Sequence, residues 1–174
     1  AATLTLTGAV GGTARLAALT LVSTGATTFG SSVKAASLSA SNSGTVFVGD
    51  GYGKSFVHIF SKDGAWKQTI CGPGAGEGQV SGPHGLWWDN RVGTLLVADR
   101  SNNRAQYFGV SRGNNPWKHV AFIKDGMRQP CHFKTRGDLL LVPDLSSAVE
   151  LVDADNKVAA VLGDGHPTNL RGAA

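Results

Sequence analysis

Two histidines lie where a short loop leads into a predicted strand, and each closely follows a proline. His84 belongs to Pro83-His84-Gly85-Leu86, and His132 belongs to Pro130-Cys131-His132-Phe133. Imidazole nitrogens are common ligands of zinc, and a catalytic zinc normally takes three protein ligands and one water. If both histidines begin the innermost strands of neighbouring sheets, their side chains converge toward one axis. The sequence therefore offers His84 and His132 as two metal ligands, one fewer than a catalytic zinc usually has.

Other catalytic motifs are missing from the sequence. It contains no Ser-His-Asp spacing, Walker loop or dinucleotide-binding glycine pattern, and the glycine-rich residues 72–78 precede no predicted helix. Cys71 and Cys131 are 60 positions apart and lack zinc-finger spacing, so one disulfide or two free thiols would fit, and we favour buried free thiols.

Length and charge limit the class of protein. The 174 residues suit one domain, and the formal charge of +4 comes from basic residues that are scattered singly among acidic ones. We therefore expect no nucleic-acid partner.

No stretch of 18 apolar residues could span a membrane, and the first twenty residues lack the pattern of an export leader. We expect a secreted, cell-surface or periplasmic protein whose leader has been removed or is absent.

The composition changes near residue 43. Of residues 1–43, 30 are Ala, Thr, Ser or Gly, and none is acidic. Thr3–Thr7 and Leu19–Val22 alternate small polar and aliphatic residues, which predicts short β-strands, with disorder as the alternative. The stretch Leu4–Leu38 weakly resembles β-solenoid repeats of bacterial adhesins. We expect residues 1–43 to form a separate low-complexity segment that becomes ordered by adding a strand to an exposed sheet edge.

An internal repeat organises residues 44–174. Three segments share a pattern of apolar residues, a small residue or proline, and then Asp, and their Asp residues are 49 and 45 positions apart: Val46–Asp50, Leu95–Asp99 and Leu140–Asp144. A polar turn and two more apolar strands follow each Asp. This period, strand number and turn chemistry predict an all-β fold with about three propeller blades of four antiparallel strands. We expect each repeated Asp to accept backbone N–H bonds in the following turn.

Several of these motifs together resemble the NHL-repeat propellers, and in particular the peptidyl-α-hydroxyglycine α-amidating lyases and related bacterial proteins. The resemblance covers about residues 45–165 and depends on Asp50–Ser55, Gly72–Gly78, Pro83–Leu86 and Val97–Arg104. Lyases of this family are six-bladed, and they cleave a carbinolamide to release glyoxylate at a zinc held near the axis by three histidines. The resemblance implies zinc here, with calcium as a second ion that the family can bind.

The resemblance also assigns roles to individual residues. His84 matches one zinc histidine, Tyr52 matches the tyrosine that acts as base, and Arg100 matches an arginine that clamps the substrate carboxylate. His132 occupies the position in its own blade that His84 has, although the lyases do not dependably carry a histidine there. Six blades at this period need roughly 270 to 300 residues, so the blades that would supply the remaining zinc histidines are not in this sequence.

Two classes of function follow. One is a metal-dependent lyase or hydrolase that acts on a small polar substrate, and the other is a noncatalytic module that binds a small molecule, a peptide or another surface. Because an array of three blades leaves apolar faces uncovered, we also expect self-association into a dimer or larger assembly, for example three blades plus three in a six-bladed ring.

Overall fold

The structure is a computed structural model that describes residues 44–110 and 117–163, together with the backbone of four short strands within residues 4–40. Its described elements are strands, apart from the three-residue 3-10 helix η1 (Arg100–Asn102). The all-β prediction is therefore confirmed for the part of the chain that the structure describes.

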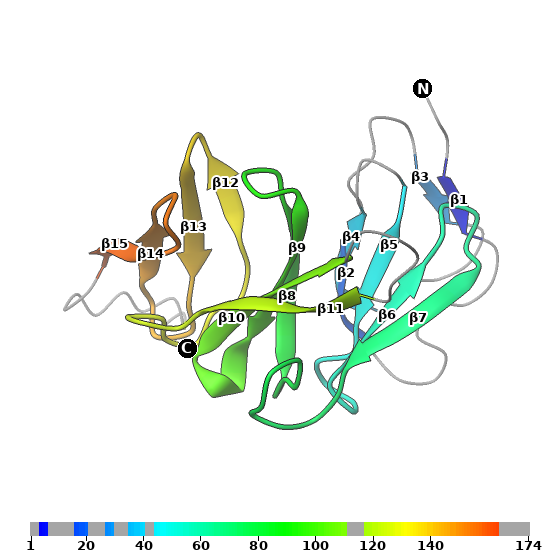
Figure 1. Ribbon diagram of the computed structural model, residues 1–174, viewed down its shortest axis with the longest axis horizontal. Coiled ribbons are helices and arrows are strands. Elements are labelled where there is room, and N and C mark those ends of the chain that lie inside the picture. The colour runs from blue at the N-terminus through cyan, green and yellow to red at the C-terminus, as the bar shows by residue number, and fades with distance from the viewer. Residues whose placement is uncertain are drawn as a thin grey trace, which may run out of the picture.

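The strands form three antiparallel sheets in succession along the chain (Figure 1). The first sheet contains β5 (Val46–Gly49), β6 (Phe56–Phe60) and β7 (Trp66–Cys71). The second contains β8 (Pro83–Asp89), β9 (Thr94–Asp99), β10 (Arg104–Val110) and β11 (Trp117–Ile123). The third contains β12 (Lys134–Arg136), β13 (Leu139–Pro143), β14 (Val149–Val152) and β15 (Val158–Leu162). Neighbours in sequence are neighbours in the second and third sheets, which is the strand order of propeller blades.

Short strands from the N-terminal segment extend the first sheet at its inner edge. β4 (Ala35–Ala40) pairs antiparallel with β5, and β2 (Leu16–Thr20) pairs parallel with β4. A further parallel pair joins β1 (Leu4–Leu6) to β3 (Thr27–Phe29). The strands predicted from the period-two pattern are thus present, although β2 begins three residues before the predicted Leu19. The pairing of β4 with β5 has the form expected of a strand added to a blade edge.

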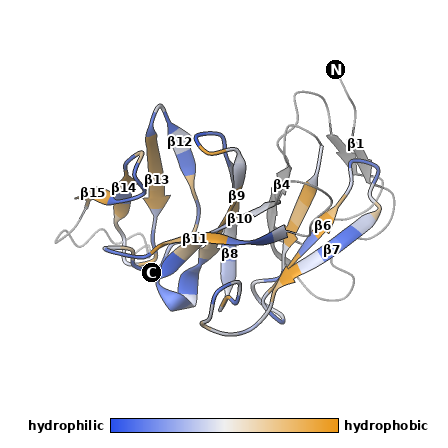
Figure 2. Ribbon diagram, viewed as in Figure 1, coloured by the Kyte–Doolittle hydropathy of each residue, from blue (hydrophilic) through white to orange (hydrophobic). Residues whose placement is uncertain are grey.

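Apolar side chains fill the two spaces between successive sheets. Between the first and second sheets, Phe47 stacks on Trp88 at 6.1 Å between ring centroids and meets Trp117 edge-on at 5.0 Å. Between the second and third sheets the core includes Tyr107 and Phe133. Figure 2 shows apolar residues along β5 and β6 and along β13 and β14. The second sheet thus buries both of its faces against its neighbours, as propeller blades do.

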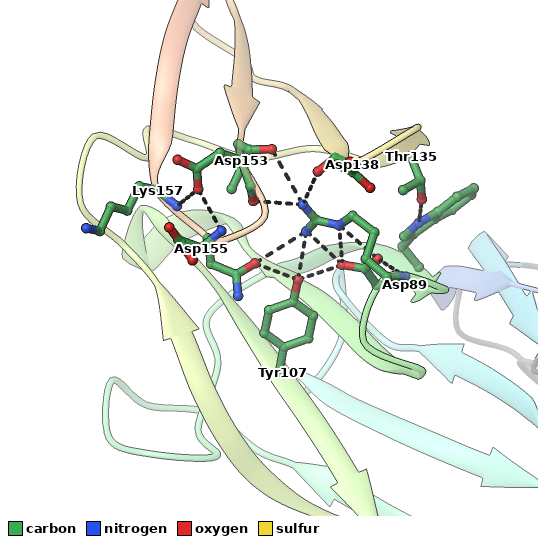
Figure 3. A network of polar contacts seen from close by, with 11 residues as sticks. Asp89, Tyr107, Thr135, Asp138, Asp153, Asp155 and Lys157 are labelled. Carbon is green, nitrogen blue, oxygen red and sulfur yellow. Dashed lines mark hydrogen bonds and ion pairs between the residues drawn. The ribbon is translucent and has the colours of Figure 1, made fainter.

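A buried guanidinium joins the second sheet to the third (Figure 3). Arg91, in the turn between β8 and β9, pairs with the fully buried Asp89 at 2.8 Å and donates to the hydroxyl of Tyr107 at 3.1 Å. Its Nη1 atom donates to the backbone carbonyls of Asp138 and Asp153 in turns of the third sheet, at 3.1 and 2.9 Å. Since a guanidinium supplies five donors in a fixed plane, one side chain satisfies acceptors from both sheets.

Replacing Arg91 with methionine should destabilise the fold by about 3–5 kcal/mol, because the substitution leaves the buried Asp89 carboxylate without its cation. Urea denaturation of Arg91→Met and of the exposed control Arg136→Met measures this. We expect the control to change the free energy of unfolding by less than about 0.5 kcal/mol. Equal stability of the two variants would show that this network does not hold the sheets together.

Candidate functional site

Side chains from all three sheets meet at the end of the molecule where β8 begins. Tyr52 comes from the turn after β5, His84 from β8, Arg100 from η1, and Cys131 and His132 from the loop before β12. The Tyr52 hydroxyl lies 3.2 Å from His84 Nε2, and the Arg100 guanidinium carbon lies 5.8 Å from the centroid of the Tyr52 ring. The structure therefore brings together three of the four residues selected from the sequence. We call these five residues the axial cluster.

The hydrogen bonds of His84 define its tautomer. Its Nδ1 lies 2.9 Å from the backbone carbonyl oxygen of Cys131, and a carbonyl can only accept, so Nδ1 carries the proton. In the neutral ring Nε2 then has a free lone pair, which accepts the bond from the Tyr52 hydroxyl. Histidines that bind metals commonly donate their other N–H to a carbonyl in this way. His84 is therefore held in the tautomer that a metal at Nε2 would need.

A glycine makes this contact with the third sheet geometrically feasible. A Cβ atom on Gly85 would lie 2.5 Å from the Cys131 carbonyl oxygen and 2.8 Å from His132 Cα. Both distances are shorter than van der Waals contact, and both neighbours are backbone atoms that cannot rotate away. Gly85 therefore lets the loop before β12 approach β8 closely enough for Cys131 to bond to His84.

His132 lies on the same end of the molecule, but no hydrogen bond between it and His84 is present. Its ring faces the edge of Trp87 at 6.1 Å, and the Lys134 ammonium lies over the same indole. Partial desolvation of the ring, with the charges of His84 and Lys134 nearby, lowers the pKa of His132. The neutral imidazole that a metal requires is thereby favoured.

The carboxylate of Asp99 positions the loop that leads to His84. Asp99 is fully buried, and its oxygens accept from the backbone N–H of Ser81 at 2.7 Å and from Arg104 Nε at 2.6 Å. The side-chain amides of Asn102 and Gln106 complete the set, at 2.8 and 2.9 Å. Asp99 therefore fastens residue 81, three positions before His84, to β9 and β10. The sequence analysis includes Asp99 in a repeated motif but does not predict that it fastens the loop before β8.

The other two repeated aspartates cap turns, as the sequence analysis predicted. Asp50 accepts from the backbone N–H of Lys54 at 2.8 Å, and Asp144 accepts from the backbone N–H groups of Ser146 and Ala148 at 2.6 and 3.2 Å. Asp99 departs from that expectation because its partners come from the preceding loop and from side chains.

The prediction of two free thiols agrees with the structure, in which both cysteines are free and partly buried.

The donor set for a metal is incomplete within residues 44–110 and 117–163. No group of three or more His, Cys, Asp or Glu side chains in these ranges is placed to hold an ion. His84 Nε2 carries a lone pair and His132 lies at the same end of the molecule, but a third ligand for zinc or a carboxylate shell for calcium is not among the described residues. His166 lies outside the described residues. The described helices include none that is long and apolar enough to cross a membrane.

Together, three successive antiparallel sheets that pack face to face define a partial β-propeller. A crystal structure of a nidogen/laminin complex contains a similar fold, with a TM-score of 0.50 and 18% identity over 68% of this chain and 43% of the other. A stretch of 71 residues is 39% identical to the peptidyl-glycine alpha-amidating monooxygenase of Mus musculus and, equally, to that of Rattus norvegicus. It covers 38% of this chain, and the chain spans only 7% of the length of either relative. No family model matches the chain.

Replacing Gly85 with alanine should push the loop of Cys131 away from β8 and break the bond to His84, with a cost of about 1–3 kcal/mol from overpacking. Loss of the His84 Nδ1–H resonance in proton NMR, together with urea denaturation, tests this. Gly93→Ala is the control, because a Cβ there meets nothing within 4 Å. Its φ of +67° costs about 1 kcal/mol but leaves the axial cluster unchanged. An intact resonance in Gly85→Ala would contradict the proposed role of the glycine.

Proposed function

We propose that this chain is part of an NHL-type propeller protein with a divalent metal site at the axial cluster, and that it carries out lyase or hydrolase chemistry related to that of the amidating enzymes. The observation that supports this most is the tautomer of His84, whose free Nε2 faces the Tyr52 hydroxyl. The similarity of a 71-residue stretch to two amidating monooxygenases supports a relation to amidating enzymes. Zinc is the ion that we propose, with His84 and His132 as ligands.

In this proposal each residue of the axial cluster has one task. Zinc, when bound, would polarise a carbinol oxygen of the substrate. Tyr52, which is 59% exposed and lies within reach of His84, would act as the phenolate after losing its own proton: it would take the proton from the hydroxyl of a carbinolamide and pass it to the leaving group. The carbon–nitrogen bond then breaks, the carbinol carbon becomes an aldehyde, and the departing amide nitrogen receives a proton. Arg100 would bind a substrate carboxylate through two parallel N–H bonds.

We further propose that association completes the site. The exposed apolar residues of the third sheet and its neighbouring turn, Leu139, Leu145 and Leu162, are 38%, 56% and 54% exposed and could pack against another copy. Each copy offers only two histidines to the axial site, so binding by one copy would be weak. A dimer brings together four imidazoles, and metal affinity should therefore rise with association.

Calorimetric titration with zinc tests the proposal at protein concentrations above and below the midpoint of dimerisation, which sedimentation velocity measures. We expect the wild type to bind zinc more tightly at the higher concentration, and His84→Ala to lose measurable binding. His119→Ala, which removes a histidine on β11 outside the axial cluster, is the control and should bind zinc as the wild type does. Equal binding by wild type and His84→Ala would remove His84 from the site and, with it, the enzymatic proposal.

A second candidate function is noncatalytic binding, which a cavity of about 410 Å³ between β7 and β11 supports. The buried Ile70 and Phe108 line it, and the Gln68 amide bonds to both backbone groups of Trp117 beside it. His119 contributes a buried Nδ1 with no partner among the described residues. An open cavity of this size, lined by both apolar and polar side chains, suits a small ligand or one peptide side chain.

Amide chemical shifts, followed during titration with a capped aromatic dipeptide, test this binding function. We expect shifts confined to Thr69–Cys71 and Lys118–His119, and their loss in Gln68→Trp, which places an indole on the face of β7 that meets Trp117. Ser61→Trp, in the turn after β6, is the control for an added indole outside the cavity. Shifts that persist in Gln68→Trp, or no shifts at millimolar dipeptide, would contradict binding at this cavity.

A further inference from the structure

The three sheets differ at one repeated position beside the repeated Asp. Two residues before each Asp is a valine, and its cross-strand partner is His58 in the first sheet, Gln106 in the second and Glu150 in the third. In the second sheet Arg104 pairs with Asp99, and Gln106 donates to it. In the third sheet Ala148 occupies the position of Arg104 and Glu150 that of Gln106. The third sheet thus has a second carboxyl group where the second has an amide and a cation.

The two carboxyl groups of the third sheet are buried and incompletely bonded. Glu150 is 0% exposed, and both of its oxygens lack a hydrogen-bond donor; the Oδ2 atom of Asp144, a residue that is 8% exposed, also lacks one. The other Asp144 oxygen accepts from Ser146 and Ala148. Ion pairs in the described part of the chain involve Asp89 and Asp99, and neither is in the third sheet.

A proton held between the two groups accounts for these unbonded oxygens. Two adjacent buried carboxylates cannot both be charged without a large repulsion, so such pairs hold one proton. Burial and the neighbouring Asp144 raise the pKa of Glu150 to about 7. Burial opposes ionisation of Asp144, but hydrogen bonds from Glu150, Ser146 and Ala148 outweigh it and lower the pKa of Asp144. These directions favour a proton on Glu150, whose hydroxyl would then donate to Asp144.

This pair is connected by backbone contacts to the segment Pro130–Cys131, which orients His84. Asp144 forms a bridge with Pro130, and the neighbouring Pro143 carbonyl accepts from the Cys131 N–H at 2.9 Å. The Cys131 carbonyl in turn accepts from His84 Nδ1. We propose that Asp144 and Glu150 act as a proton-sharing positioning pair that holds Cys131, and through it His84, in place. Loss of the shared proton would put two negative charges in contact and displace this segment.

The other ionisable groups around the pair are few. The Cys131 thiol faces both carboxyl groups, and Arg100 lies near that thiol. The backbone N–H of Arg128 faces Glu150, and the Arg128 guanidinium reaches the Ser146 hydroxyl at 3.5 Å, one group away from Asp144. Burial raises the pKa of the Cys131 thiol, so it stays neutral when Glu150 loses its proton. Glu150 is therefore the group whose charge changes near neutral pH.

The pH dependence has a defined sign. A carboxyl group whose pKa is higher in the folded state holds a proton that the unfolded chain releases, so its contribution to stability is lost as the pH rises from about 4.5 to about 7. His58, His119 and His132 have lowered pKa values and give the opposite slope in part of this range. The difference between the wild type and a Glu150 variant isolates the contribution of the pair.

Glu150→Gln tests the proposal, because it installs the residue that the second sheet has at this position and supplies a donor that never titrates. We expect the urea midpoint of Glu150→Gln, relative to wild type, to rise between pH 5 and pH 8. We also expect the Cys131 amide shift to show a step near pH 7 in the wild type and no such step in the variant. Asp138→Asn, an exposed carboxyl group in the same sheet, should behave as the wild type does.

A wild-type Cys131 amide without a step near pH 7, or a step that persists in Glu150→Gln, would overturn the proposal. The wild-type measurement requires no variant to fold and no metal. The consequence for metal binding rests on the proposed function: at pH 8, Glu150→Gln should bind zinc more tightly than the wild type does. If neither protein binds zinc, the proposed function fails, whereas the Cys131 step still decides whether the pair positions this segment.

Discussion

The buried carboxylate of Asp99 is the constraint on which the arrangement of the axial cluster depends. A charge without solvent must be paired and fully hydrogen-bonded, and Asp99 meets this requirement with donors from four residues. These donors come from the loop before β8, from η1 and from β10. Because one group must satisfy all of them, the loop that carries Ser81 has only one position relative to β9. His84 follows this loop and Arg100 follows Asp99 directly, so the bonds to Asp99 also set the positions of these two residues.

Contact between neighbouring sheets then determines which residues of different sheets meet. The flat faces of the sheets pack through buried aromatic and aliphatic side chains, which bring the sheets together without fixing a unique register. Directional contacts supply the register: Arg91 binds carbonyls of the third sheet, and Gln68 binds the backbone of Trp117. The small size of Gly85 allows the final approach, in which Cys131 reaches His84.

The repeats differ at the positions around their shared aspartate. The aspartates of the second and third sheets therefore have different charged partners. In the second sheet a cation pairs with the aspartate and an amide donates to it. In the third sheet a second carboxyl group replaces the amide, which makes the equivalent centre depend on a proton. The same backbone geometry therefore supports two electrostatic solutions, and the one that can titrate lies next to the segment that contacts His84.

The sequence alone determined the class of fold and selected four of the five residues of the axial cluster, Tyr52, His84, Arg100 and His132. The apolar run that ends in Asp recurs after 49 and again after 45 residues, so it was sufficient to predict three antiparallel sheets. Tyr52, His84 and Arg100 were identifiable because each belongs to a short motif beside a repeat. Only the tertiary structure decided the tautomer of His84, the need for Gly85, and the buried pair of Asp144 and Glu150. The first two features arise where β8 and the loop before β12 come together, and contacts between residues 47 positions apart leave no periodic trace in a single sequence. The third arises within one sheet, because packing buries both carboxyl groups, and a single sequence does not show which polar side chains are buried.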